Sequence, residues 1–295
     1  MLYIEAKDNK GEIFMNILVT GATGDYGSHA LAYLKKFAPN DNLFALARSK
    51  EKAQSIKQDG VTVRLGDFSD KTSMVEALKD IDRLLFVSVP TPGIQKNVVD
   101  AAKEDNVKFI AYTSIFAPEY SQFGLEQNHS ETEQWIKDSG IPYTFLRNSW
   151  YLEVNQAMFE YAQKTGKFPY FAGNGKIALT YKKDYAEAGA RAVASGKFGP
   201  VLNLSSQPLT YRELGLATQE ALGKSIDIEE TSESDFNKDL ASAGISSTWA
   251  TIADTYQKYT KNGNNGQESA TTADFEKALG HPITKLSDAI KDILN

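Results

Sequence analysis

The sequence predicts an α/β fold in which helices cover both faces of a parallel β-sheet. Between residues 16 and 146, short β-branched and aliphatic runs alternate with helical stretches. Several of these runs, such as 83–89, are almost wholly apolar, as strands buried on both faces are. The alternation is typical of a doubly wound, Rossmann-type parallel sheet with right-handed crossovers.

The expected strands and helices follow one another in regular order. Strands are expected over 16–20, 42–48, 61–65, 83–89, 108–115 and 141–146, and helices over 28–34, 50–58, 71–78, 94–104 and 130–139. Asp70 is expected to cap the third helix.

After Arg147 the pattern changes. A long helix is expected over 151–164, short strands over 168–171 and 176–181 around a turn, and a helix over 184–195. Residues 201–204 can rejoin the sheet, and helices dominate from 210 on, with a short strand over 226–228. We therefore expect a Rossmann domain over 15–150 and a smaller, mainly helical C-terminal lobe over 151–295 with segments returning to the sheet. Residues 1–14 are interpreted as an N-terminal extension, with an ordered arm as the alternative.

Composition narrows the function classes. The chain of 295 residues carries a net charge of −6, which gives it no general attraction to nucleic acid or an anionic membrane. It has no cysteine, so disulfides, thiolate metal sites and cysteine nucleophiles are excluded, and its three histidines form no metal-binding pattern. No apolar run has the length of a membrane helix, and we expect a cytoplasmic protein. The oligomeric state is open, and a homodimer is compatible with the sequence.

A glycine-rich turn comes directly after the first strand. Gly21, Gly24 and Gly27 stand at three-residue spacing directly before a helical stretch, which differs from the general Gly-x-Gly-x-x-Gly fingerprint. A helix that begins at such a turn points unpaired N–H groups at an anion, and glycine lets the anion approach the backbone closely. A dinucleotide pyrophosphate is the usual occupant. The candidate cofactor contacts here are Gly21, Thr23, Gly24, Asp25, Tyr26 and Gly27.

The ends of the next strands supply further candidates. Arg48 ends the second strand, where an arginine suits a 2′-phosphate, so the sequence favours NADPH over NADH. A solvated surface arginine is the alternative. After the third strand, Asp67 can accept a hydrogen bond from adenine while Phe68 packs against the ring, although Asp67 could instead cap a helix.

Two more loops lie at the carboxyl ends of strands, where ligands bind in such sheets. Ser88, Val89 and Pro90 are expected beside the ribose and pyrophosphate, and Thr113 and Ser114 end the fifth strand. A catalytic hydroxyl needs a positioned proton donor, which in extended short-chain dehydrogenases is a Tyr-x-x-x-Lys pair on the next helix.

That pair is missing from the expected helix. His129 and Glu133 occupy the tyrosine and lysine spacing, where they could relay a proton or form a structural pair.

The sixth strand ends in Arg147-Asn-Ser-Trp-Tyr151, whose residues are expected to flank the nicotinamide. Asn148 offers an amide, and Trp150 or Tyr151 offers a flat wall for a planar substrate. Asn148, Tyr151 and His129 are the catalytic candidates, while Arg147 and Trp150 are cofactor candidates. Packing at a helix start is the alternative interpretation of the aromatic residues.

Several motifs together resemble one family. They are Gly-Ala-Thr-Gly at 21–24, Ala-Arg-Ser at 47–49, Val-Lys-Phe-Ile-Ala-Tyr-Thr-Ser at 107–114, His129-x-x-x-Glu133 and Leu-Arg-Asn-Ser-Trp-Tyr at 146–151. The chain resembles the NmrA-like group of atypical short-chain dehydrogenases, and within it the bacterial NAD(P)H:quinone oxidoreductases of the second type.

The resemblance implies a two-domain oxidoreductase that binds NADPH without flavin and passes hydride to a small quinone-like acceptor. It also implies that absence of the tyrosine and lysine is normal, because a quinone accepts hydride readily. A non-catalytic NAD(P)-sensing regulatory protein is the alternative, as in the regulatory members of the group. A sugar epimerase is a third option, weakened by the missing pair.

Overall fold

The computed structural model describes residues 14–56, 59–120 and 122–295, and its seven-stranded sheet confirms the predicted fold class. Residues 1–13 of the extension expected over 1–14 lie outside these residues, as do 57–58 of the helix expected over 50–58, which in the structure already ends at Ala53. The chain divides into two compact units. The first contains 14–118, 124–147 and 185–202, and the second contains 119–120, 122–123, 148–184 and 203–295.

The sheet has the strand order β10-β6-β5-β4-β1-β2-β3. Its strands are β1 (Asn16–Val19), β2 (Asn42–Ala47), β3 (Val61–Leu65), β4 (Arg83–Phe86), β5 (Phe109–Ile115), β6 (Tyr143–Asn148) and β10 (Val201–Leu204). β1 pairs in parallel with both β2 and β4, β2 with β3, and β4 with β5. The order reverses between β1 and β4, and such a switch point is where doubly wound sheets bind their ligands.

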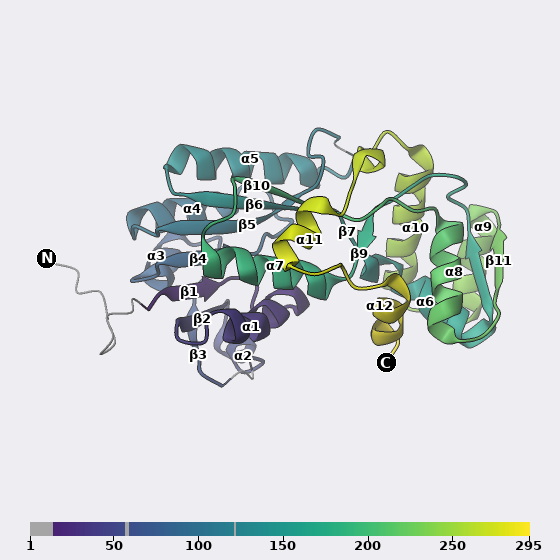
Figure 1. Cartoon of the computed structure of the whole chain (residues 1–295), viewed down its shortest axis with the longest axis horizontal. Helices are drawn as coiled ribbons and strands as arrows, with labels where there is room; N and C mark the ends of the chain where they lie inside the picture. The colour runs from purple at the N-terminus through teal and green to yellow at the C-terminus, as the bar shows by residue number, and fades with distance from the viewer. Residues whose placement is uncertain (1–13, 57–58, 121) are drawn as a thin grey trace, which may run out of the picture. The chain divides into compact units, whose positions relative to one another are not determined.

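Helices cover the sheet of the first unit in two groups (Figure 1). They are α1 (Asp25–Phe37), α2 (Lys50–Ala53), α3 (Lys71–Leu78), α4 (Gln95–Glu104), α5 (Leu125–Ser139) and α7 (Lys182–Ser195). Helices α3, α4 and α5 pack side by side, and their residues Met74, Val98 and Ile136 join Leu18 and Phe86 of the sheet in one buried core. On α1, Tyr26 and Phe37 contact α7.

Two elements begin or end at other residues than the sequence predicts, one because of local hydrogen bonds and the other because of a left-handed glycine. β4 ends at Phe86 rather than near Val89, because the Thr20 hydroxyl binds both the N–H and the carbonyl of Val87. α5 begins at Leu125, five positions before the expected start, directly after Gly124 in the left-handed conformation. His129 therefore lies inside the helix rather than at its beginning.

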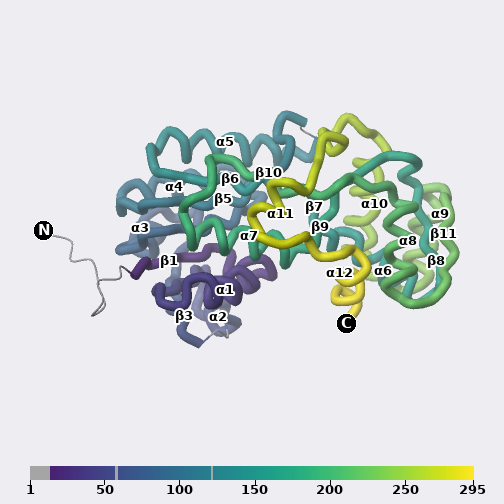
Figure 2. The backbone as a smooth tube through the Cα atoms, in the orientation of Figure 1, coloured from purple at the N-terminus to yellow at the C-terminus, as the bar shows by residue number. Residues whose placement is uncertain are grey.

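The second unit is mainly helical, with two small sheets. Its elements are β7 (Trp150–Tyr151), η1 (Leu152–Asn155), α6 (Gln156–Thr165), β8 (Lys167–Tyr170), β9 (Leu179–Thr180), α8 (Tyr211–Leu222), β11 (Asp227–Glu230), α9 (Glu233–Ser242), α10 (Ser247–Asn262), η2 (Gln267–Ser269), α11 (Ala273–Leu279) and α12 (Leu286–Ile293). Strands β8 and β11 run side by side in parallel (Figure 2).

The helix expected over 151–164 is shorter in the structure. Trp150 and Tyr151 pair with Leu179 and Thr180 as strands, which holds their backbone extended, and the α-helix starts only at Gln156. No helix among the described residues is both long and apolar enough to span a membrane.

Candidate active site

The glycine turn between β1 and α1 requires glycine at two positions. Gly21 has a φ of +61°, in the left-handed region, and a Cβ on Gly27 would lie 2.4 Å from the Gly21 carbonyl oxygen. Gly24, at the N-cap position of α1, has no side chain that could cap the helix. The first N–H groups of α1 are therefore left for an anion. Gly21, Thr23, Gly24 and Asp25 are exposed, as a ligand-facing loop requires.

Tyr26, another predicted cofactor contact, is directed into the first unit. Its side chain is 6% exposed, and its hydroxyl donates to the carbonyl of Tyr185 on α7 at 3.0 Å. The ring therefore joins α1 to α7, and only the backbone of Tyr26 is left for the predicted contact with the cofactor.

Arg48 lies directly after β2 as an exposed residue. Among the described residues its guanidinium forms no hydrogen bond or ion pair with the protein. The Ser69 hydroxyl and N–H donate to Asp67 Oδ1 at 2.7 and 2.8 Å, and these bonds, with a smaller contribution from Arg48, lower the pKa of Asp67. An exposed guanidinium that forms no hydrogen bond or ion pair among the described residues fits the predicted 2′-phosphate contact.

Phe68 and Asp70 lie in the segment between β3 and α3. Phe68 is 7% exposed, and its ring packs edge-on to Phe86 with centroids 5.6 Å apart, so this ring belongs to the core. Asp70, as expected, caps α3 by accepting from the N–H groups of Thr72 and Ser73. Asp67 is thus not the cap of α3, and the adenine contacts of Asp67 and Phe68 remain predictions.

Side chains from other elements hold the loop after β4. The Ser88 N–H donates to Thr113 Oγ1 at 2.8 Å, and the Thr113 hydroxyl donates to Ser88 Oγ at 3.0 Å. The Val89 N–H donates to Gln95 Oε1, while Pro90 is exposed. The structure therefore brings together the predicted residues at the ends of β4 and β5.

Ser114, at the same end of β5, donates its hydroxyl to Glu133 Oε1 at 2.7 Å. Arg147 donates from Nε to Glu133 Oε1 at 2.9 Å and from Nη2 to Glu133 Oε2 at 2.7 Å. The Glu133 side chain is 3% exposed. The Ser114 proton is committed to Glu133, so the Ser114 oxygen can accept a hydrogen bond from a ligand but has no second proton to donate. Arg147 is thus held by an ion pair that the sequence did not predict, and its contact with the cofactor remains a prediction.

His129 does not hydrogen-bond to Glu133 in the described residues. Its Nδ1 lies 3.0 Å from the Tyr112 hydroxyl, and the two rings are 5.9 Å apart. Burial lowers the pKa of His129 to about 4, and the nearby Glu133 charge opposes that shift only partly. The imidazole is therefore neutral near pH 7.

The three candidates at the end of β6 and directly after it, Asn148, Trp150 and Tyr151, lie in the second unit and have different surroundings. Asn148 is 5% exposed, its Nδ2 reaches the Tyr151 hydroxyl only at 3.5 Å, and its Oδ1 has no hydrogen-bond partner among the described residues. Trp150 is 8% exposed and packs edge-on to Phe123, Tyr256 and Tyr259 from the strand β7, not from a helix start. Asn148 therefore keeps a buried acceptor that a ligand could use.

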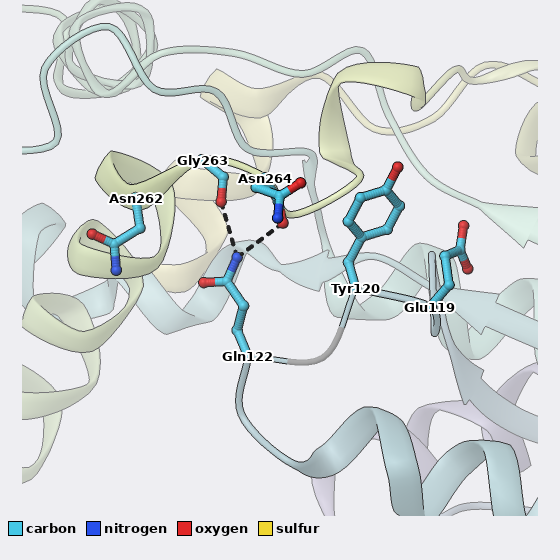
Figure 3. Close-up of a pocket in the computed structure, with 6 residues that line it drawn as sticks. All are labelled: Glu119, Tyr120, Gln122, Asn262, Gly263 and Asn264. Atoms are coloured by element: carbon cyan, nitrogen blue, oxygen red, sulfur yellow. Dashed lines mark hydrogen bonds between the residues drawn. The ribbon is translucent and has the colours of Figure 1, made fainter.

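A pocket of about 530 Å³ lies in the second unit (Figure 3). Its lining residues are Glu119, Tyr120, Gln122, Asn262, Gly263 and Asn264. The Gln122 amide donates to the carbonyls of Gly263 and Asn264 at 2.9 and 3.2 Å, joining residue 122 to the end of α10. The lining has no cationic side chain, so it is not suited to the phosphates of a dinucleotide. No group of three or more His, Cys, Asp or Glu residues in the described part of the chain could hold a metal ion.

Gln95, Tyr112 and Thr20 were not among the predicted site residues. Thr20 follows the apolar run of β1, and Tyr112 lies in the apolar strand β5, whereas Gln95 begins α4 directly before Lys96 and Asn97. A polar residue next to an apolar run is a signal for Thr20 and Tyr112 only, and even there it does not show which partner the buried polar group has.

Comparisons with known proteins agree with this geometry. Residues 21–177 match the family model described as NAD(P)H-binding. Quinone oxidoreductase 2 of Escherichia coli strain K12 is 35% identical over 95% of this chain and 99% of its own length. Its crystal structure with NADPH matches with a TM-score of 0.78 and 34% identity, covering 95% of this chain and all of the other.

A second solved structure is also similar. The Citrobacter sp. triphenylmethane reductase, crystallised with NADP(H), matches with a TM-score of 0.81 and 32% identity, covering 94% of this chain and 99% of that protein. These matches confirm the resemblance seen in the motifs. The chain belongs to the NAD(P)H-binding, NmrA-like family.

Proposed function

We propose that this protein is an NADPH-dependent reductase that passes hydride directly to a quinone-type acceptor without flavin. The similar proteins support the first part, because the E. coli relative is named a quinone oxidoreductase and the Citrobacter relative a triphenylmethane reductase, and both were crystallised with NADP(H) or NADPH. Quinones and cationic triphenylmethane dyes are both electrophiles that can take up hydride before any proton.

The observation that carries the proposal is the committed proton of Ser114. Its hydroxyl donates to Glu133, and burial keeps the His129 ring neutral, so neither residue is a strong acid toward a ligand. Reduction of a ketone to an alkoxide needs such an acid. A quinone that accepts hydride becomes a stabilised hydroquinone anion, which water can protonate. An acceptor of this type therefore suits the residues present.

The residues have distinct roles in this proposal. NADPH supplies the hydride from its nicotinamide ring. The turn from Gly21 to Gly27 binds the pyrophosphate, and Arg48 binds the 2′-phosphate. Asn148, through its buried and unpaired Oδ1, and Tyr151 orient the acceptor. The bond between the Tyr112 hydroxyl and His129 Nδ1 argues against a direct catalytic role of His129.

The experiment mixes the purified protein with NADPH and a series of benzoquinones and naphthoquinones, and follows the loss of reduced-nicotinamide absorbance. We expect turnover in protein whose visible spectrum shows no flavin, and no increase when flavin is added. Asn148→Ala should lower kcat, whereas Asn262→Ala, which removes an exposed amide from α10, should not. NADPH binding without turnover on any acceptor would contradict the proposal and favour the regulatory alternative.

A further inference from the structure

The loop after β4 is fixed at one residue by two side chains of helices. The Val89 N–H donates to Gln95 Oε1 on α4 at 3.1 Å, and Asn128 Nδ2 on α5 donates to the Val89 carbonyl at 2.9 Å. Both polar groups of this peptide backbone are therefore held from outside the loop. The orientation of the Gln95 amide decides whether the N–H of Val89 meets an oxygen or a nitrogen.

The other end of the Gln95 amide determines that orientation. Gln95 is fully buried, and its Nε2 donates to Thr132 Oγ1 at 2.8 Å and to Tyr112 Oη at 3.2 Å. Thr132 in turn donates its hydroxyl to the Asn128 carbonyl at 2.8 Å. A flipped amide would place its oxygen where a donor is now required, and its NH₂ against the N–H of Val89.

His129 completes the chain of hydrogen bonds. Tyr112 Oη accepts from Gln95, so its own proton is available for His129 Nδ1 at 3.0 Å. We assign the Tyr112 proton to this bond, which leaves Nδ1 as the acceptor in a neutral ring that carries its proton on Nε2. All donors then point in one direction, from Val89 through Gln95 and Tyr112 to His129.

We propose that Gln95, Tyr112 and His129 are positioning residues that hold the Val89 loop in the shape that binds the cofactor. The inference rests on the proposed function, because it takes the Ser88–Pro90 loop as part of the NADPH site at the carboxyl end of β4. None of the three residues is required to touch the substrate. The proposed positioning role does not depend on the reducing strength of NADPH or on the chemistry of the acceptor.

The first test compares Gln95→Met and Tyr112→Phe with Thr144→Val. Gln95→Met removes the amide and should weaken NADPH binding about tenfold, the equivalent of one to two buried hydrogen bonds, with a larger effect on KM than on kcat. Tyr112→Phe should weaken binding less, because Thr132 still holds Gln95. Thr144→Val also removes a buried hydroxyl of the first unit, one bonded to the Gly199 carbonyl, and should leave NADPH affinity unchanged.

The second test uses rescue at position 129. His129→Leu leaves the Tyr112 proton without an acceptor and should weaken NADPH binding about threefold, the effect of a fraction of one hydrogen bond. His129→Gln offers an amide oxygen and should restore most of the affinity. If the histidine instead donates a proton in catalysis, both variants will lower kcat alike and leave the NADPH dissociation constant unchanged, which would overturn the inference.

A third measurement separates this inference from the proposed function. Hydrogen exchange at the Val89 amide without any cofactor should be faster in Gln95→Met than in the wild-type protein and in Thr144→Val. If the wild-type protein reduces no acceptor, the proposed function fails while faster exchange and weaker NADPH binding still support the positioning role. Unchanged exchange and unchanged NADPH affinity in a folded Gln95→Met variant would refute it.

Discussion

Replacing Arg48 should change the affinity for NADPH much more than the affinity for NADH. Its guanidinium is exposed and forms no hydrogen bond or ion pair among the described residues, so in the proposed site a 2′-phosphate would be its main partner. A hydrogen bond to a charged group contributes about 1.5–3 kcal/mol, so Arg48→Ala should weaken NADPH roughly tenfold or more and NADH little. Fluorescence titration of both cofactors measures this.

The matched control for Arg48 is Arg212→Ala. This change removes the same charge from an exposed position on α8 and should alter neither affinity. Equal losses of NADPH and NADH affinity in Arg48→Ala would show that the arginine does not bind a 2′-phosphate.

The lowered pKa of His129 should make the free energy of unfolding depend on pH. Its pKa is about 4 in the folded protein and near 6.5 when unperturbed, so between these values the unfolded chain binds more protons than the folded one. The free energy of unfolding should therefore decrease as pH falls from about 6.5 to about 4, by up to about 1.4 kcal/mol per pH unit. Urea unfolding at a series of pH values gives the slope, and His129→Gln should flatten it. An identical slope in the variant would assign it to other groups.

The positions of single residues were predictable where they depend on the immediate neighbours in the chain. Gly27 and Arg48 could be placed because a turn and a strand end are local features. Glu133 could not, because its partners come from β5 and β6, and only the packed sheet brings Ser114 and Arg147 to the same carboxylate. The sequence showed a charged residue on a helix but not what it would bind.

At the scale of elements, the contact between α1 and α7 depends on Gly189. A Cβ at this position would lie 2.3 Å from the Tyr26 hydroxyl oxygen. Gly189→Ala should therefore lower the free energy of unfolding by about 1–3 kcal/mol, the usual cost of overpacking. Adding Tyr26→Phe removes the clashing oxygen and should recover part of the loss, as measured by chemical denaturation.

Gly199→Ala is the control for this pair. A Cβ there would meet nothing within 4 Å, so the substitution should change stability by no more than about 0.5 kcal/mol. If Gly189→Ala and Tyr26→Phe gave simply additive losses, the proposed clash would not be the cause.

Elements with their own periodicity were predictable, whereas those that depend on pairing were not. The strands of the large sheet lie close to their expected ranges because their apolar runs and flanking turns are local. The helix expected from Tyr151 begins instead at Gln156, since Trp150 and Tyr151 pair with β9, nearly thirty residues later in the chain. Apolar spacing alone cannot distinguish such a two-residue strand from a first helical turn.

For the whole molecule, the alternation of strands and helices was sufficient to predict the doubly wound sheet. The assignment of the segment between β5 and α5 was harder to predict. Residues 119–120 and 122–123 belong to the second unit, although both flanking elements belong to the first. Aromatic contacts of Phe123 with Trp150 and Tyr259 hold this segment in the second unit. They involve residues far apart in the sequence, which no local pattern relates.

Cofactor binding should appear as a change in the stability of the whole molecule. A ligand that binds only the folded state adds about 2.7 kcal/mol at a hundredfold excess over its dissociation constant. For a chain of this size we expect NADPH at that excess to raise the midpoint of thermal unfolding by about 5 °C. NADH at the same concentration should raise it less, because it lacks the phosphate that Arg48 is proposed to bind. Scanning calorimetry of the wild-type protein measures both shifts. No shift with either cofactor would contradict the dinucleotide site, and equal shifts would contradict only the preference for NADPH.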